Sequence, residues 1–121
     1  GCKNLNKINI SNKVVILEKG VFGGCENLNE ITIPYGMINI GDGAFEECKS
    51  LREVSIPDSV ASIGDYAFWN CQSLNQITVW SNVTSIGYSA FDGCKNLTIR
   101  AFKGSYAKRY ALENEIPFEE I

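Results

Sequence analysis

Apolar positions recur along this chain at a fixed interval of 23 residues. Within each interval two aliphatic residues flank one polar residue, as in Ile31-Thr32-Ile33, and this alternation is typical of a short strand with one buried face. The recurring columns are Leu5, Leu28, Leu51, Leu74 and Leu97; Ile8, Ile31, Val54 and Ile77; Ile10, Ile33, Ile56 and Val79; Val14, Met37, Val60 and Val83; Leu17, Ile40, Ile63 and Ile86; and Phe22, Phe45, Phe68 and Phe91. Only a structural repeat keeps so many columns in phase, so the chain is predicted to be a stack of similar coils.

One such coil cannot bury its own aliphatic and aromatic side chains, so neighbouring coils must stack into one continuous core. Their strands then lie parallel, about 4.8 Å apart. Pro34 and Pro57 end two of the strands, and Gly41 and Gly64 are expected to allow a sharp change of direction later in the coil. The pattern predicts a mainly β, or α/β, repeat solenoid over residues 1–99, with four full coils and the start of a fifth.

The pattern changes after residue 99. Ser105 is a candidate N-cap for a helix that carries Tyr106, Ala107, Tyr110 and Ala111 on one face, and Ile116-Pro117-Phe118 has the pattern of an extended segment. Residues 100–121 are therefore predicted to form a helix–strand cap of the same domain, which covers apolar side chains and a strand edge that would otherwise be exposed. The opposite end has no such segment, and we expect further coils upstream in a longer protein.

Composition excludes several classes of function. The net charge is −3, the pI is near 4.9 and the 11 Lys and Arg residues are scattered, which does not suit a nucleic-acid surface. No run approaches the roughly 18 apolar residues of a membrane span, so no membrane insertion is expected. The chain has no histidine, so neither a Ser/His/Asp nor a Cys/His catalytic set can be built, and adjacent carboxylates such as Glu46-Glu47 are expected to be solvated. We expect no enzyme and no cofactor.

Five cysteines form a further column: Cys2, Cys25, Cys48, Cys71 and Cys94. A zinc site would need closely spaced pairs, commonly with histidine, so no metal site is expected. Stacking would bring neighbouring cysteine Cα atoms within the distance of a disulfide. However, residues of one column point the same way, and five is an odd number, so the cysteines are predicted to be free, buried thiols.

The outward residues of the strands are the candidate partner-binding face: Lys7, Glu30, Thr32, Glu53, Ser55, Gln76, Thr78 and Trp80. Trp80 has two interpretations, a binding hot spot or a ring that packs on a neighbouring proline or on the cap. Trp69 and Tyr66 replace polar or small residues of the sibling coils, and we predict that they form a second apolar patch on the turn side.

The unit Cys-x-x-Leu-x-x-Ile-x-Ile-Pro, followed by Val-x-x-Ile-Gly-x-x-Ala-Phe, resembles the BspA-like class of leucine-rich repeats from residue 2 to about 99. The closing segment, from Gly104 to Phe118, resembles the segment that often ends such arrays. The first coil departs from the motif with Glu18, Lys19 and Gly20, and Trp80 stands where Pro34 and Pro57 are in the sibling coils. The resemblance implies a leucine-rich-repeat right-handed solenoid and a secreted or surface-attached bacterial protein used in adhesion or protein binding, without catalytic residues.

These patterns lead to one main expectation about function. The chain is predicted to be a non-catalytic recognition module, secreted or on the cell surface, that binds a protein, from a host or matrix, or a glycan. The alternative is a structural spacer repeat that carries another domain and binds no ligand of its own. A carbohydrate-active enzyme is a third, weaker interpretation.

Overall fold

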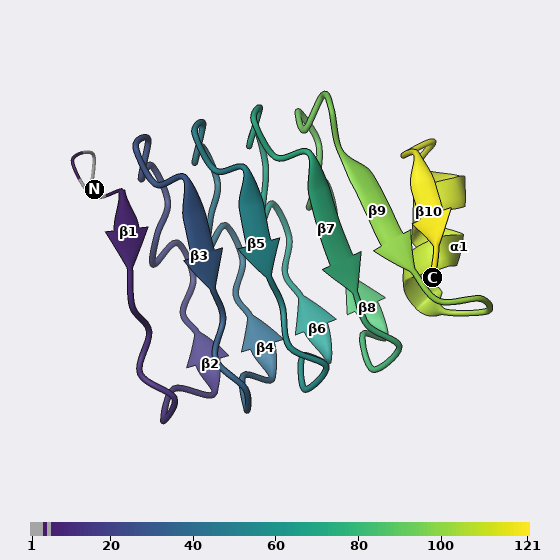
Figure 1. The fold of residues 1–121 in the computed structure, drawn as a ribbon, viewed down its shortest axis with the longest axis horizontal. Helices are drawn as coiled ribbons and strands as arrows, with labels where there is room; N and C mark the ends of the chain where they lie inside the picture. The colour runs from purple at the N-terminus through teal and green to yellow at the C-terminus, as the bar shows by residue number, and fades with distance from the viewer. Residues whose placement is uncertain (1–3, 5) are drawn as a thin grey trace.

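The computed structural model describes residue 4 and residues 6–121. Within this part of the chain short strands alternate with turns until a single helix and a last strand close the array (Figure 1). The elements are β1 Lys7–Ile8, β2 Ile16–Leu17, β3 Glu30–Thr32, β4 Asn39–Ile40, β5 Glu53–Ser55, β6 Ser62–Ile63, β7 Gln76–Val79, β8 Ser85–Ile86, β9 Thr98–Ala101, α1 Tyr106–Glu113 and β10 Phe118–Glu120.

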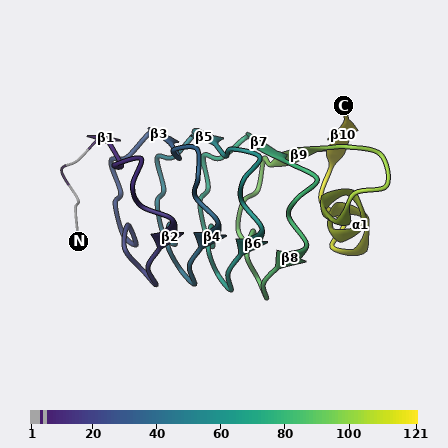
Figure 2. The ribbon, with the colours of Figure 1, turned by 90° about the horizontal axis from the view of Figure 1, so that it is seen from below.

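Each of the four full coils contributes one strand to each of two parallel sheets. Sheet A has the order β1-β3-β5-β7-β9-β10 and sheet B has the order β2-β4-β6-β8. The two sheets lie on opposite sides of the coils, and both extend along the axis of the array (Figure 2). Residues 23 apart are register partners, as Ile31 is with Val54 and Ile40 with Ile63. The predicted solenoid of 23-residue coils with parallel strands is confirmed.

The last coil changes the register by one residue. Ile77 pairs with Ile99 and Gln76 with Thr98, so β7 and β9 are offset by 22 residues instead of 23. The segment between Leu97 and Ile99 is one residue shorter than its equivalents in the earlier coils. The fifth coil therefore keeps its strand, although its sequence pattern departs from the repeat.

The core lies between the sheets and is built from the repeated columns. The phenylalanine rings stack along the axis with centroids 5.5, 5.2 and 5.3 Å apart, from Phe22 through Phe45 and Phe68 to Phe91. Phe45 and Phe68 are fully buried. Each coil thus packs against the coil before it and buries its apolar side chains. A repeat array needs this packing because a single coil is not stable by itself.

The cysteine column lies beside these rings. Cys48 and Cys71 are free, buried thiols, as predicted, whereas Cys94 is free but only half-buried. The three sulfurs donate to the carbonyl oxygens of Phe22, Phe45 and Phe68 at 3.2, 3.1 and 3.2 Å. At Cys25 the prediction is wrong, because this residue is disulfide-bonded. The spacing of stacked coils suits a disulfide, and side-chain direction alone was too weak an argument against one. The free thiol predicted at Cys2 lies outside the described residues.

The glycine column has a different role from the expected one. Gly41, Gly64 and Gly87 do not have positive φ angles, so a sharp turn is not what requires glycine there. A Cβ on Gly64 would lie 2.6 Å from the amide nitrogen of Asp42 and 2.8 Å from the carbonyl carbon of Gly41. Glycine is needed because the backbones of adjacent coils touch at this column.

The predicted cap closes the C-terminal end of both sheets. Ser105 caps α1 by accepting from the amide of Lys108 at 3.2 Å, and β10 pairs parallel with β9. The Tyr106 hydroxyl accepts from the amide of Ile86 in β8, while the Tyr110 ring meets Phe91 edge-on at 6.1 Å. No helix in the described ranges has the length and hydropathy of a transmembrane span.

Candidate partner-binding surface

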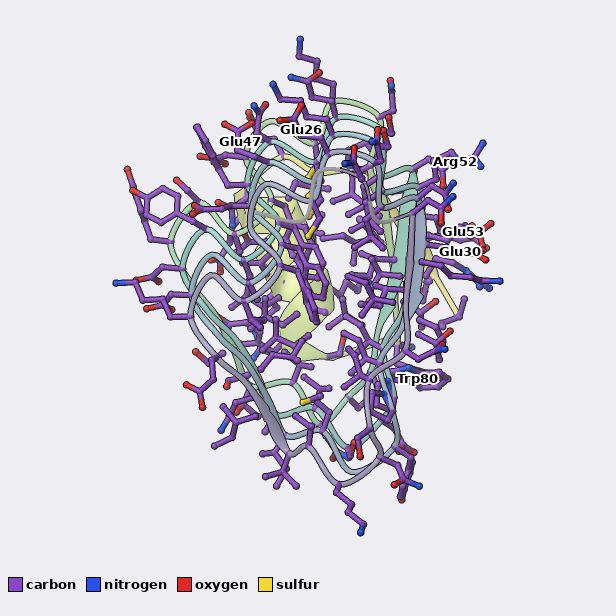
Figure 3. The ribbon with its side chains drawn as sticks, turned by 90° about the vertical axis from the view of Figure 1, so that its left-hand side faces the viewer. Glu26, Glu30, Glu47, Arg52, Glu53 and Trp80 are labelled. Carbon is purple, nitrogen blue, oxygen red and sulfur yellow. The ribbon has the colours of Figure 1, made fainter. Side chains whose placement is uncertain are left out.

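The predicted face residues come together on the outer side of sheet A. Parallel pairing in register places them in rows across the strands. The first row is Lys7, Glu30, Glu53 and Gln76, and the second contains Thr32 and Ser55, with Thr78 one strand further. Figure 3 shows Glu30, Glu53 and Trp80 projecting from this side of the sheet. Six of the eight predicted residues are exposed, and Thr78 and Trp80 are half-buried.

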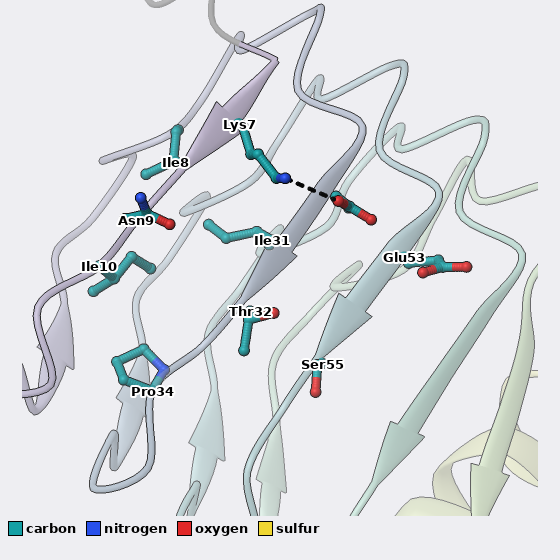
Figure 4. A pocket seen from close by; sticks show the side chains of 10 residues that line it. Lys7, Ile8, Asn9, Ile10, Ile31, Thr32, Pro34, Glu53 and Ser55 are labelled. Carbon is teal, nitrogen blue, oxygen red and sulfur yellow. Dashed lines mark ion pairs between the residues drawn. The ribbon is translucent and has the colours of Figure 1, made fainter.

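The first row carries more negative than positive charge. Lys7 Nζ lies 3.9 Å from Glu30 Oε1, which is the dashed contact in Figure 4, and both side chains are exposed. Such a pair contributes at most about 1 kcal/mol. Glu30 and Glu53 are direct register partners, so two carboxylates face each other across β3 and β5. Like charges at this position repel.

The face is hollowed between the rows of side chains. A groove of about 370 Å³ is lined by Lys7, Glu30, Thr32, Glu53 and Ser55 together with Ile8, Asn9, Ile10, Ile31 and Pro34 (Figure 4). A second hollow of about 330 Å³ continues across β5 and β7, where Ser55, Gln76 and Thr78 line it. The face therefore combines exposed polar groups with an apolar floor.

Part of the Trp80 side chain is used in contacts within the fold. Its indole N–H donates to the carbonyl of Ile56 at 2.6 Å, and its ring lies 5.5 Å from that of Phe102, which leads into the cap. The structure thus shows packing on the capping segment, which is part of the second interpretation of this residue. The half-buried side chain still has surface on the outer face of sheet A.

The sequence pattern missed the extension of this face onto β9 and β10. Arg100 is the register partner of both Thr78 and Glu119. Its Nε is buried without a hydrogen-bond partner and lies 3.7 Å from Glu119 Oε1. The shortened fifth coil hid this position, although the alternation Ile99-Arg100-Ala101 was a signal that could have located it.

The predicted apolar patch on the turn side is present. Tyr66 and Trp69 are 40% and 36% exposed and their rings meet edge-on at 6.4 Å. Tyr88, which the column comparison did not single out, adds a third ring 5.7 Å from Tyr66. Neither predicted residue is enclosed.

Cys48 and Cys71 are poorly suited to nucleophilic chemistry. Burial raises the pKa of Cys48 to about 11, against a smaller lowering by a backbone hydrogen bond. The pKa of Cys71 is also raised, first by its interaction with the side chain of Cys94 and then by burial. A reactive cysteine needs a lowered pKa, because the thiolate is the nucleophile. Among the residues with assigned positions, no three His, Cys, Asp or Glu side chains are grouped as a metal site would require.

Sequence comparison identifies the repeat. The BspA type leucine-rich-repeat region matches residues 1–116 in six copies. The chain belongs to the BspA-type leucine-rich-repeat family. No curated protein sequence matches it.

Solved structures agree with this family. A leucine rich cell surface protein from Faecalibacterium prausnitzii A2-165 is 41% identical, with a TM-score of 0.67 over 69% of this chain. The Treponema pallidum leucine-rich-repeat protein is 26% identical, with a TM-score of 0.57 over 72% of this chain and 52% of its own. A leucine-rich-repeat protein from Bacteroides ovatus ATCC 8483 is also 26% identical, with a TM-score of 0.50 over 98% of this chain and 43% of its own.

This BspA-type chain spans only 22% of the Faecalibacterium protein. The family match and the similarity to this protein identify the chain as a leucine-rich-repeat module of the type found in bacterial surface proteins. Such modules are compatible with protein binding.

Proposed function

We propose that this chain is a non-catalytic recognition module, secreted or displayed on the cell surface, that binds a protein of a host or matrix through the outer face of sheet A. The observation that carries the proposal is the face itself. Seven of its predicted residues line two adjoining grooves, and all are held by strands in register. A rigid surface loses little conformational entropy on binding, which favours a recognition role.

The unbalanced charge on this face supports the same function. Glu30 and Glu53 repel each other across the strands, and among the described residues Glu53 has no ion pair. A partner that brings a donor or a cation to this position would relieve the repulsion. A glycan with several hydroxyl groups is a second class of ligand for the polar rows.

The surface location rests on similarity. The Faecalibacterium structure is that of a leucine rich cell surface protein, and its repeats are the most similar in sequence of the three compared. The absence of histidine from the chain and the raised pKa of Cys48 support a non-catalytic role.

The alternative, a structural spacer, is favoured by one observation. The indole N–H of Trp80 is satisfied by Ile56 and its ring packs on Phe102, so the largest side chain on the face already has a role in the fold. A spacer would need such packing but no partner.

A pair of matched variants separates the two functions. Ser55→Tyr fills the groove on sheet A, while Ser85→Tyr places the same side chain on an exposed position of sheet B. Binding is measured against a panel of animal extracellular-matrix proteins and a glycan array, with circular dichroism melting to verify folding. We expect Ser55→Tyr to weaken binding at least about tenfold and Ser85→Tyr to leave it unchanged. Loss of the few interface residues that carry most of the binding free energy commonly costs more than about 1.4 kcal/mol, which is a factor of about ten in affinity. Equal binding by both variants would contradict the proposed face.

A further inference from the structure

Three aromatic rings gather on the turns that follow β6 and β8. Tyr66 contacts Trp69 and Tyr88 edge-on, with interplanar angles of 84° and 82°. Tyr88 is 72% exposed and the other two are more than a third exposed. The phenylalanines of the core column, by contrast, are buried along most of the array. The turn rings therefore present much of their surface to solvent.

Carboxylates lie beside Tyr66, the central ring of this cluster. A hollow of about 340 Å³ is lined by Lys19, Gly20, Asp42, Gly43, Glu46, Asp65 and Tyr66. It holds three carboxylates and one cation. Within the described part of the chain Asp42, Glu46 and Asp65 form no ion pair. Lys19 is the one cation that lines the hollow, so two of the three negative charges are not balanced there.

Two of these carboxylates are held in place by the backbone. Asp42 Oδ1 accepts from the amide of Asp65 at 2.8 Å, and Asp65 Oδ1 accepts from the amide of Tyr88 at the same distance. Each keeps its second oxygen for a ligand. The charge is therefore positioned before any ligand arrives, which lowers the ordering cost of binding.

We propose that this turn surface, formed by Tyr66, Trp69, Tyr88, Asp42, Glu46 and Asp65, binds an arginine- or lysine-bearing segment of a protein partner. A cation is attracted to aromatic faces, and a guanidinium can stack on a ring while it pairs with a carboxylate. A neutral sugar would use the rings but would leave the excess negative charge of the hollow unbalanced. The site is separate from the outer face of sheet A.

The two tryptophans make the site directly observable. The chain contains only Trp69 and Trp80, one beside this cluster and one on sheet A, so a ¹H–¹⁵N spectrum of the whole chain shows one indole N–H signal from each surface. Trp69→Phe and Trp80→Phe assign the signals. Titration with a hexa-arginine peptide is expected to shift the Trp69 signal until it saturates and to leave the Trp80 signal in place. The shift should weaken at high salt, because screening reduces charge attraction.

Charge variants test the role of the carboxylates. Asp42→Asn with Asp65→Asn keeps the Oδ1 acceptors but removes two charges, and at least a tenfold loss of hexa-arginine affinity is expected. The control, Asp58→Asn with Glu113→Gln, removes two charges from exposed positions away from the hollow. Its affinity should stay within about twofold of the wild type.

Tyr66→Gly tests the rings without endangering the fold. Tyr66 has a φ of 56°, in the left-handed region that favours glycine, and Gly20 and Gly43 occupy the same position in the sibling coils. We expect this variant to fold and to lose hexa-arginine affinity.

Three outcomes overturn the proposal. They are an unchanged Trp69 signal with hexa-arginine, equal losses in the two double variants, or a shift produced only by a neutral oligosaccharide or by hexa-glutamate. None of these bears on the function proposed for sheet A, because that face is reported by Trp80 and by its own variants.

Discussion

The glycine column makes a sharp prediction about how the coils are held together. Gly64→Ala adds one methyl group at a place where the neighbouring coil leaves no room, since the new Cβ would lie 2.6 Å from the Asp42 nitrogen. The coils must separate locally. Two contacts weaken with that shift, the bond from the Gly64 amide to the Ile40 carbonyl and the bond from the Asp65 amide to Asp42 Oδ1, both 2.8 Å long.

The expected loss of stability follows from these contacts. Overpacking costs about 1–3 kcal/mol, and weakening hydrogen bonds costs up to about 1 kcal/mol each, so we expect Gly64→Ala to lower the free energy of unfolding by about 3 kcal/mol. A domain of 121 residues unfolds with an entropy of roughly 0.25 kcal/mol per kelvin, so Tm should fall by about 12 °C in a calorimetric or circular dichroism melt.

Gly20→Ala is the matched control. Gly20 has a φ of 65° and open space around its missing Cβ, so alanine there meets only backbone strain. That strain costs roughly 1–2 kcal/mol, or about 4–8 °C of Tm. If Gly64→Ala melts at or above the temperature of Gly20→Ala, contact between adjacent coils is not what requires glycine in this column.

Three further predictions concern the core and the cap. Phe68→Ala removes a ring stacked at 5.2 and 5.3 Å on its neighbours and should cost about 3–5 kcal/mol in urea unfolding, more than Phe22→Ala at the half-buried end of the column. Burial raises the pKa of Cys48 from 9.0 to about 11. Its contribution to stability is therefore fully present below pH 9 and is lost as pH rises towards 11, and urea midpoints of Cys48→Ala should decline less over that window than those of the wild type. Ser105→Ala removes the cap on the Lys108 amide and should cost about 1 kcal/mol, while Ser105→Asp should retain most of the stability; equal melting of both variants would count against the capping role.

The part of this molecule that could be predicted from its sequence is the part that repeats. In a stacked solenoid the main contacts of a residue are with its equivalents one coil before and after, so a column such as Phe22 to Phe91 is also a set of spatial neighbours. The strands, the core and the polar outer face follow from that periodicity. The cap was predictable for another reason, since Ser105 and the Tyr-Ala face of α1 carry a local helix pattern.

Tertiary structure decided the features that set one coil apart from its siblings. The disulfide at Cys25, the packing of Trp80 on Phe102 and the one-residue shift that brings Arg100 beside Thr78 have no counterpart in sibling coils. The glycine column was visible in the sequence, but its cause was not, because residue identity does not distinguish a positive φ angle from a backbone that passes too close for a methyl group. Only the distance between adjacent coils separates these two reasons for glycine.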